Sequence, residues 1–273
     1  MTLQPANVRV LGALAVVFVS ATGLIALFLP FLSSALADQS SVDNSRSFDS
    51  SLLLGAVVAG SMFIAIGELA RGPGAESLSR SVALLGTLVA IDATLRLVPS
   101  FFGASPIFAL IALVGYVFGS RFGFVMGSLT LLLSAAITAG VGPWLPFQML
   151  CAGWMGMAAG WLPKPASPRV EVASLALFGG LYGFVYGALM NLYSWPFASP
   201  GASSDIGLYW SPTLTLLESL DRYWAFYITT SLVHDASRAI ANIVLILAAG
   251  ASVLRLLRRF HTRTTWKTSA PGL

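Results

Sequence analysis

The chain has 273 residues, of which 56% are hydrophobic and only 10% are charged. A soluble domain carries about 25% charged residues, so this composition excludes a soluble globule. The single cysteine excludes a disulfide scaffold, and the high apolar content excludes a disordered chain. The formal net charge is +4, but the basic residues form no stripe along the sequence. The charge therefore does not indicate nucleic-acid binding. The apolar runs are continuous and do not alternate, which predicts an all-α, polytopic membrane protein.

Eight apolar segments follow one another along the chain, and a helix needs about 20 such residues to cross a bilayer. In chain order, the predicted helices are 10–34, 51–70, 81–98, 105–119, 122–140, 146–163, 172–195 and 222–257. The fourth and fifth share one apolar run that would be roughly 54 Å long as a single helix, so we expect a break at Gly119-Ser120-Arg121-Phe122-Gly123. The last helix exceeds one crossing, and we expect residues 222–234 to project outside the membrane.

The basic residues predict the orientation, because cytoplasmic segments of membrane proteins are rich in Lys and Arg. Eight crossings place both termini on one side. With that side in the cytoplasm, eleven of the 15 Lys and Arg residues lie inside, whereas the outer connections 35–50 and 196–222 are mainly acidic. We therefore predict cytoplasmic N- and C-termini and a multi-pass protein of a bacterial-type cell (plasma) membrane. One alternative stays open: Ala35-Leu36-Ala37 resembles a signal-peptidase site, and cleavage there would remove the first helix.

Motifs for the common enzyme chemistries are missing from the sequence. Neither lysine follows the glycines of a phosphate-binding loop, there is no Gly-x-Ser-x-Gly elbow, and the two histidines do not have zinc-ligand spacing. Cys151 is interpreted as a small apolar residue, with a soft metal ligand as the alternative. We therefore predict that the protein is not an enzyme and has no cofactor and no metal.

Polar side chains within the predicted helices concentrate in the outer half of the membrane, where such groups are costly and are functional candidates by default. Asp92 and Arg96 lie at i and i+4 on the third helix, and Asp235 and Arg238 lie at i and i+3 on the last. One interpretation is a structural clamp in which Asp92 pairs with Arg96 or Arg238. The other is a polar pocket open to the outside. The candidate ligand-binding residues are Asp92, Arg96, Trp144, Gln148, Asn191, His234, Asp235 and Arg238.

Small residues line one face of the third predicted helix. Ala83, Gly86, Thr87 and Ala90 recur at spacings of three and four residues, and such faces let helices approach closely. Internal packing is one interpretation of this face, and docking of another membrane subunit is the other. Gly156 belongs to a similar run in the sixth helix, for which we expect internal packing.

Two runs of residues carry a family resemblance. One is the turn Gly115 to Gly123 (Gly-Tyr-Val-Phe-Gly-Ser-Arg-Phe-Gly), and the more specific one is Gly140 to Leu150 (Gly-Val-Gly-Pro-Trp-Leu-Pro-Phe-Gln-Met-Leu). With them, the chain resembles the substrate-binding (S) component of energy-coupling factor (ECF) vitamin transporters. The resemblance implies a two-helix N-terminal extension (1–79), a six-helix substrate-binding core (80–257) and a basic cytoplasmic tail (258–273).

The resemblance also implies a mechanism and partners. Such components bind a micronutrient at the outer face, dock on a transmembrane coupling subunit that carries two ATPase subunits, and release the substrate inside by toppling. In this family the docking face bears a pair of alanines. The matching positions here are Ala83 and Thr87, with Gly86 and Ala90 beside them. The implied partners are a small vitamin-like substrate, the coupling subunit, the two ATPase subunits and the lipid bilayer, with no nucleic acid.

The aromatic residues of the predicted outer end bear on the substrate. An interfacial belt explains many of them, and their excess over the inner end favours a bulky or planar organic ligand that stacks on some of them. Cobalamin or a related corrinoid is the first candidate.

Two functions from other classes remain as alternatives. One is an integral-membrane enzyme that acts on lipid, with Asp92, His234 and Asp235 as acid–base groups. The other is a self-sufficient secondary transporter, in which inverted repeats and broken helices at mid-membrane are expected. The sequence has no recognised acid–base spacing and no clear repeat, so the capture subunit of an importer is the leading prediction.

Overall fold

The computed structural model describes residues 5–33, 42–69, 75–98, 102–197, 207–211 and 214–265, within which every regular element is a helix. In chain order these are α1 (Pro5–Ser33), α2 (Val42–Leu69), α3 (Ala75–Leu95), α4 (Ile107–Phe118), α5 (Ser120–Ile137), α6 (Leu145–Ala159), α7 (Pro168–Ser194), the short 3-10 helix η2 (Trp195–Phe197), α8 (Leu216–Thr230) and α9 (Leu232–Thr265). The segment Ala35 to Ala37, where the alternative cleavage is predicted, lies outside the described residues.

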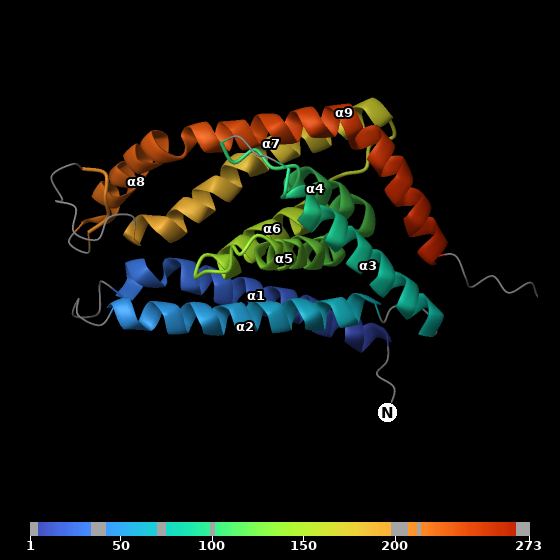
Figure 1. Cartoon of the computed structure of the whole chain (residues 1–273), viewed down its shortest axis with the longest axis horizontal. Coiled ribbons are helices and arrows are strands. Elements are labelled where there is room, and N and C mark those ends of the chain that lie inside the picture. Colours follow the sequence, from blue (N-terminus) through green and yellow to red (C-terminus); the bar gives the residue numbers. More distant parts are fainter. Residues whose placement is uncertain are drawn as a thin grey trace, which may run out of the picture.

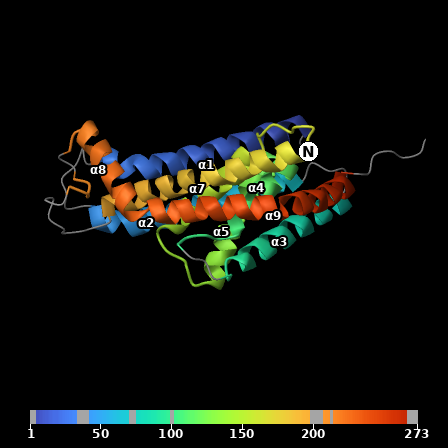
Figure 2. The same ribbon diagram turned by 90° about the horizontal axis from the view of Figure 1, so that it is seen from above.

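The helices form three tiers in the view of Figure 1. α1 and α2 run side by side in one tier, α4 to α6 occupy the middle, and α7 and α9 form the tier on the far side, with α3 along one flank. The start of α1 and the end of α9 lie toward one end of the molecule, and α8 lies at the other end (Figures 1 and 2).

The predicted break within the fourth apolar run is confirmed. α4 ends at Phe118 and α5 begins at Ser120, with Gly119 between them at a φ of 96°. That backbone conformation is strained for any residue with a Cβ atom. One apolar run therefore becomes two short helices because a glycine lies at the turn.

Two other predicted boundaries are wrong. α2 begins at Val42, so much of the polar connection predicted over 35–50 is helical. The single helix predicted over 222–257 is two helices, α8 and α9, which are separated at Ser231.

The start of α8 explains why the predicted connection 196–222 ends early. Thr215 accepts a hydrogen bond from the Glu218 backbone N–H, and the Glu218 carboxylate accepts one from the Thr215 backbone N–H at 2.8 Å. This reciprocal pair is a capping box, which satisfies the free N–H groups at the start of a helix. The bonds from Thr215 also lower the pKa of Glu218.

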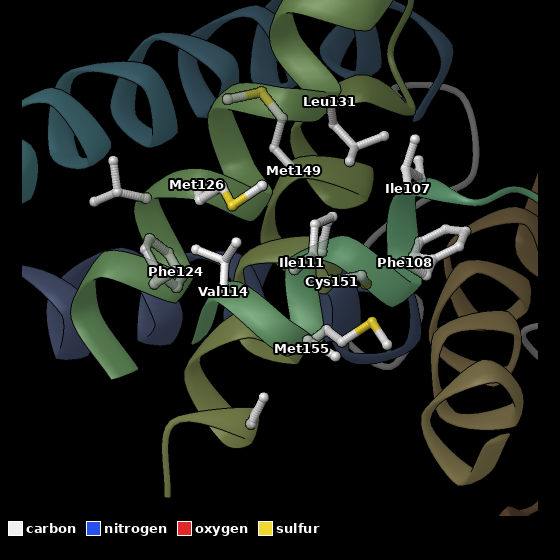
Figure 3. Close-up of a cluster of buried hydrophobic side chains, with 14 of the residues drawn as sticks. Ile107, Phe108, Ile111, Val114, Phe124, Met126, Leu131, Met149, Cys151 and Met155 are labelled. Atoms are coloured by element: carbon white, nitrogen blue, oxygen red, sulfur yellow. The ribbon is translucent and has the colours of Figure 1, made fainter. Parts of the chain in front are cut away.

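Glycines hold the middle tier together by letting helix backbones touch. A Cβ atom on Gly115 of α4 would lie 2.0 Å from the Gly156 carbonyl of α6, and one on Gly123 of α5 would lie 2.3 Å from the same oxygen. Large buried side chains of α4, α5 and α6 gather in one hydrophobic cluster, which the close-up in Figure 3 shows. The predicted internal packing of Gly156 is confirmed. By contrast, Ala83, Gly86, Thr87 and Ala90 of α3 are all exposed, so packing within the described chain does not explain that face.

The N-terminal helices pack directly on the middle tier. Trp154 of α6 donates a hydrogen bond to Ser20 Oγ of α1 at 2.9 Å. A Cβ atom at Gly23 of α1 would lie 2.2 Å from the side chain of Leu150, which shows how closely α1 approaches α6. The residues predicted as an N-terminal extension are therefore part of the same packed body.

Apolar side chains cover much of the molecule's outside, the reverse of a soluble protein. Large exposed residues include Phe18 and Ile25 on α1 and Leu177 and Leu181 on α7. Among the described residues, three helical segments are long and apolar enough to cross a membrane, Ser120–Ile137, Pro168–Ser194 and Leu232–Thr262, and shorter apolar helices are present at Gly12–Phe28, Leu52–Ala65 and Ile107–Phe118. This pattern agrees with a helical membrane protein.

Candidate functional site

Asp235 and Arg238 form an ion pair in the first turns of α9. Only 1% of Asp235 is exposed, and Arg238 Nη1 donates to its Oδ1 at 2.5 Å. The same nitrogen donates to the Gly183 carbonyl of α7 at 3.2 Å. The guanidinium lies over the rings of Phe108 and Tyr186, 5.6 and 5.0 Å from their centroids, which is a cation–π arrangement. Arg238 therefore joins α9 to both α7 and α4.

Glycines at every fourth position of α7 make room for these polar side chains. A Cβ atom at Gly187 would lie within 2.0 Å of the Asp235 carboxylate, and one at Gly183 would lie 3.0 Å from the backbone of α9. One turn before Gly183 in α7, the Gly179 carbonyl accepts a hydrogen bond from Asn242 Nδ2 at 2.9 Å. The two helices are therefore close enough for α9 to bury a row of polar groups against the α7 backbone.

Asn191, near the end of α7, is tied to the break between α8 and α9. Its Oδ1 accepts a hydrogen bond from Ser231 Oγ at 2.7 Å, whereas its Nδ2 has no partner in the described chain. The Ser231 carbonyl accepts from the Asp235 backbone N–H at 2.9 Å, one turn into α9. Asn191, Ser231 and Asp235 therefore lie next to one another.

Asp92 of α3 and Arg96, which directly follows α3, are directed toward α5. Asp92 is fully buried and lies beside Thr130, yet neither its two oxygens nor the Thr130 hydroxyl completes a hydrogen bond within the described residues. Arg96 is partly buried and donates a long bond of 3.5 Å to Ser134 Oγ, one turn further along α5. Both pairs bring a polar side chain from the end of α3 or from the turn after it next to a hydroxyl group of α5.

The predicted clamp between Asp92 and an arginine does not form among the described residues, where neither Asp92 oxygen completes a hydrogen bond and Arg238 pairs with Asp235. α3 and α9 nevertheless contact each other. We refer to Asp92, Arg96, Asn191, Asp235, Arg238 and Asn242 as the Arg238 cluster.

Several buried polar atoms of the Arg238 cluster have no hydrogen bond. Buried polar groups in proteins are almost always paired, and an unpaired one costs about 1–3 kcal/mol. Within the described residues, the unpaired side-chain atoms are both Asp92 oxygens, Asn191 Nδ2, Asp235 Oδ2, Arg238 Nε and Asn242 Oδ1, together with the hydroxyls of Thr130, Ser105 and Ser61. Both donors and acceptors are present, and the two carboxylates formally balance the two arginines. The cluster therefore suits a ligand that both donates and accepts hydrogen bonds.

The other three predicted residues are Trp144, Gln148 and His234, of which His234 directly precedes Asp235. Trp144 is 43% exposed and donates to the Gly140 carbonyl at 3.2 Å. Gln148 is half-buried near the start of α6. His234 is exposed, and its ring meets the edge of Phe102 with centroids 5.7 Å apart. No side-chain hydrogen bond joins these three to the cluster in the part of the chain that the structure describes.

A second buried ion pair, which was not predicted, lies at the opposite end of α7. Glu171 is 5% exposed and accepts hydrogen bonds from Tyr116 Oη of α4 at 2.6 Å and from Arg258 of α9. Lys164 lies over the Tyr116 ring, 5.7 Å from its centroid. We refer to Tyr116, Lys164, Glu171 and Arg258 as the Glu171 cluster. The helix prediction began at Val172, which left Glu171 in a connection, whereas α7 begins at Pro168.

A family model with the description "ECF transporter, substrate-specific component" matches residues 80–249, more than half of the chain. The chain belongs to this family. The family resemblance predicted from the two glycine-rich runs is therefore confirmed. Substrate-specific components bind small molecules and associate with a module of membrane coupling and ATPase subunits. Comparisons with curated proteins and with solved structures gave no match.

In this ECF substrate-specific component, the matched residues contain the whole Arg238 cluster, which spans Asp92 to Asn242. They also contain Glu171 but not Arg258. α1 and α2, which pack on the middle tier, lie before the matched residues. The candidate site is thus built entirely from the family's region, whereas other parts of the packed body are additions to it.

Proposed function

We propose that this protein captures a vitamin or related micronutrient at the Arg238 cluster and delivers it as the substrate-binding subunit of an ATP-driven importer. Family membership carries this proposal. The unpaired buried atoms of the cluster support the position of the site, because a ligand with donors and acceptors would complete their hydrogen bonds. The rings of Phe108 and Tyr186 beside Arg238 favour a ligand with a planar portion. Cobalamin or a related corrinoid is the first substrate to test.

The same proposal includes the topology. We place the N- and C-termini in the cytoplasm of a bacterial cell, eight helices across the membrane, and α8 with the Arg238 cluster toward the outside. The arrangement of the chain supports it, since the start of α1 and the end of α9 lie toward the same end and α8 lies at the other (Figure 1).

Native mass spectrometry of the detergent-purified chain tests substrate capture. The chain is examined for a compound that co-purifies and is then offered cobalamin, riboflavin, thiamine and biotin in turn. We expect one compound to form a one-to-one complex, and we expect Asn191→Ala to weaken it without reducing expression. His234→Ala is the control, because that side chain is exposed and makes no hydrogen bond to the cluster within the described residues. A chain that retains none of these compounds, or that alters lipid by itself, would count against the proposal.

We also propose that the small-residue face of α3 docks on the coupling subunit. Ala83, Gly86, Thr87 and Ala90 are all exposed, and a Cβ atom on Gly86 would meet no atom within 4 Å. A flat face of this kind allows the backbone of another helix to approach closely. Its exposure supports docking, because no described part of the chain uses it for packing.

Co-purification with the coupling and ATPase subunits tests this face. Gly86→Trp should lower the yield of the complex about tenfold, the equivalent of ~1.4 kcal/mol, because the indole would hold the two helices apart. Leu177→Trp on α7 is the matched control, since Leu177 is also apolar and exposed. The substituted chain should still bind its substrate. Equal yields for the two variants would remove this face from the docking surface.

A further inference from the structure

A cavity of about 650 Å³ lies between α1, α7 and α8. Its size falls in the range of about 300–1,000 Å³ that is typical of small-molecule sites. Among its walls are Phe28 from α1, Leu189 and Leu192 from α7, Leu220 and Tyr223 from α8, and Trp210 from the segment before α8. Of the described residues that line it, none carries a charge. No member of the Arg238 cluster is among them.

Hydrogen bonds and ring contacts hold the aromatic walls in place. Tyr223 Oη donates to the Ala188 carbonyl at 2.6 Å, and Trp195 Nε1 donates to the Leu208 carbonyl at 2.9 Å. The rings of Trp195 and Tyr223 meet edge to face, with centroids 5.3 Å apart. Because these polar atoms are already bonded to backbone, the two rings present mainly apolar surface to the cavity. The cavity is therefore preformed and offers a ligand little hydrogen bonding.

The cavity and the Arg238 cluster use different sides of α7. One side of α7 contacts α9, or Ser231 directly before it, through Gly183, Gly187 and Asn191. The other side lines the cavity through residues that include Ala188 and Leu192. None of the buried unpaired atoms belongs to a residue that lines the cavity. A charged or strongly polar molecule would lose its hydration there and would find only a few polar side chains, Ser211, Ser219 and Trp210, and no charged one in return, which is costly. An uncharged apolar molecule has no such favourable hydration to lose.

We propose that this cavity is a second binding site, which takes an uncharged apolar molecule. The ligand is either an acyl chain from the bilayer or a free apolar compound, because both present the same chemistry to these walls. Phe28 gives α1 a part in the site, although α1 precedes the residues that match the family. α1 thus adds a wall to a pocket that is otherwise lined by residues of the family's region. This site does not depend on capture of a vitamin at the Arg238 cluster.

Photolabelling of the full chain in phosphatidylcholine vesicles tests the site. One probe is 3-trifluoromethyl-3-phenyldiazirine, a small uncharged carbene precursor, and the other is phosphatidylcholine with a diazirine in its acyl chain. Peptide mapping should show saturable labelling of Leu189 and Leu192 by at least one probe. Ala188→Phe should reduce this labelling severalfold by filling the cavity. Leu181→Phe, at a position on α7 that is 59% exposed and outside the cavity, should leave it unchanged.

A second variant, Ser219→Phe, fills the cavity from α8. It tests whether filling the cavity reduces labelling if Ala188→Phe does not fold. Labelling by both probes would identify an acyl chain as the occupant, and labelling by the small diazirine alone would identify a free apolar compound. The proposal would be overturned if the labelling does not saturate. It would also be overturned if both filling variants are labelled as strongly as Leu181→Phe. Vitamin binding is a separate measurement, so failure of that function would not alter this result.

Discussion

The Arg238 cluster and the Glu171 cluster both join α7 to α9, yet they differ in how completely their polar groups are paired. Glu171 accepts hydrogen bonds from Tyr116 and Arg258, and no atom of its cluster is a buried unpaired atom in the described chain. In the Arg238 cluster, Asn191, Asp235 and Arg238 each keep one buried atom without a partner. A fully paired polar network rigidifies a structure, whereas a partly paired one retains capacity for further bonds. The difference favours packing at one end of α7 and supports the proposal of ligand binding at the other.

The two ion pairs also differ in exposure and in what they connect. The Arg258 side chain is 46% exposed, whereas that of Arg238 is 12% exposed. The Glu171 pair links two helices directly, and the Asp235–Arg238 pair lies within α9 and reaches α7 through the Gly183 carbonyl. An exposed arginine that loses its partner can turn to water, but a buried one cannot. Removal of the carboxylate should therefore cost more at the Arg238 cluster.

The largest effect on stability is expected for Asp235→Ala. It leaves Arg238 buried without its counter-charge, and breaking a buried pair in this way costs about 3–5 kcal/mol. We expect a lower free energy of unfolding in detergent, measured by denaturant titration. His234→Ala is the control, since the neighbouring side chain is exposed and should change stability little. If both variants unfold at the same denaturant concentration, Asp235 does not hold Arg238 in the way that the structure indicates.

A smaller effect is expected for Glu171→Gln. The amide still accepts a hydrogen bond from Tyr116 but loses the charge that attracts Arg258, so stability should fall by about 1–2 kcal/mol. Arg255→Gln is the matched control, because Arg255 is exposed and bonds only within α9. The comparison predicts that vitamin affinity is unchanged in both variants. A loss of affinity in Glu171→Gln at unchanged stability would contradict the division of roles between the two ends.

Local sequence was a good guide where a contact depends on neighbouring residues. The break at Gly119 and the packing of Gly156 follow from glycine's lack of a Cβ atom, and the i, i+3 spacing of Asp235 and Arg238 forms a pair in the structure. The same reasoning failed for Asp92 and Arg96. α3 ends at Leu95, so Arg96 leaves the helix and the i, i+4 geometry is lost.

Contacts between distant segments could not be predicted from local patterns. Glu171 and Arg258 are 87 residues apart, and their pairing depends on how far α7 and α9 slide past each other. The break at Ser231 depends likewise on Asn191, which bonds the Ser231 hydroxyl from another helix. Thr229, Thr230 and Ser231 give only a weak local signal for the end of a helix. The cavity could not be predicted from the sequence for the same reason, because the parts of α1 and α8 that line it come together only in the folded chain.

The smallest effect, and one of opposite sign, is expected for Asp92→Asn. Asp92 is fully buried and neither of its oxygens completes a hydrogen bond among the described residues, so the amide should leave the free energy of unfolding unchanged or raise it by about 1 kcal/mol. Thr130→Val should behave similarly, because the Thr130 hydroxyl is also unpaired. Denaturant titration of both variants measures the sign. If a ligand completes the Arg238 cluster, Asp92→Asn should weaken vitamin binding while the empty protein keeps its stability. A fall in stability as large as that of Asp235→Ala would instead show that Asp92 supports the fold, and the two ends of α7 would then differ less than their hydrogen bonds indicate.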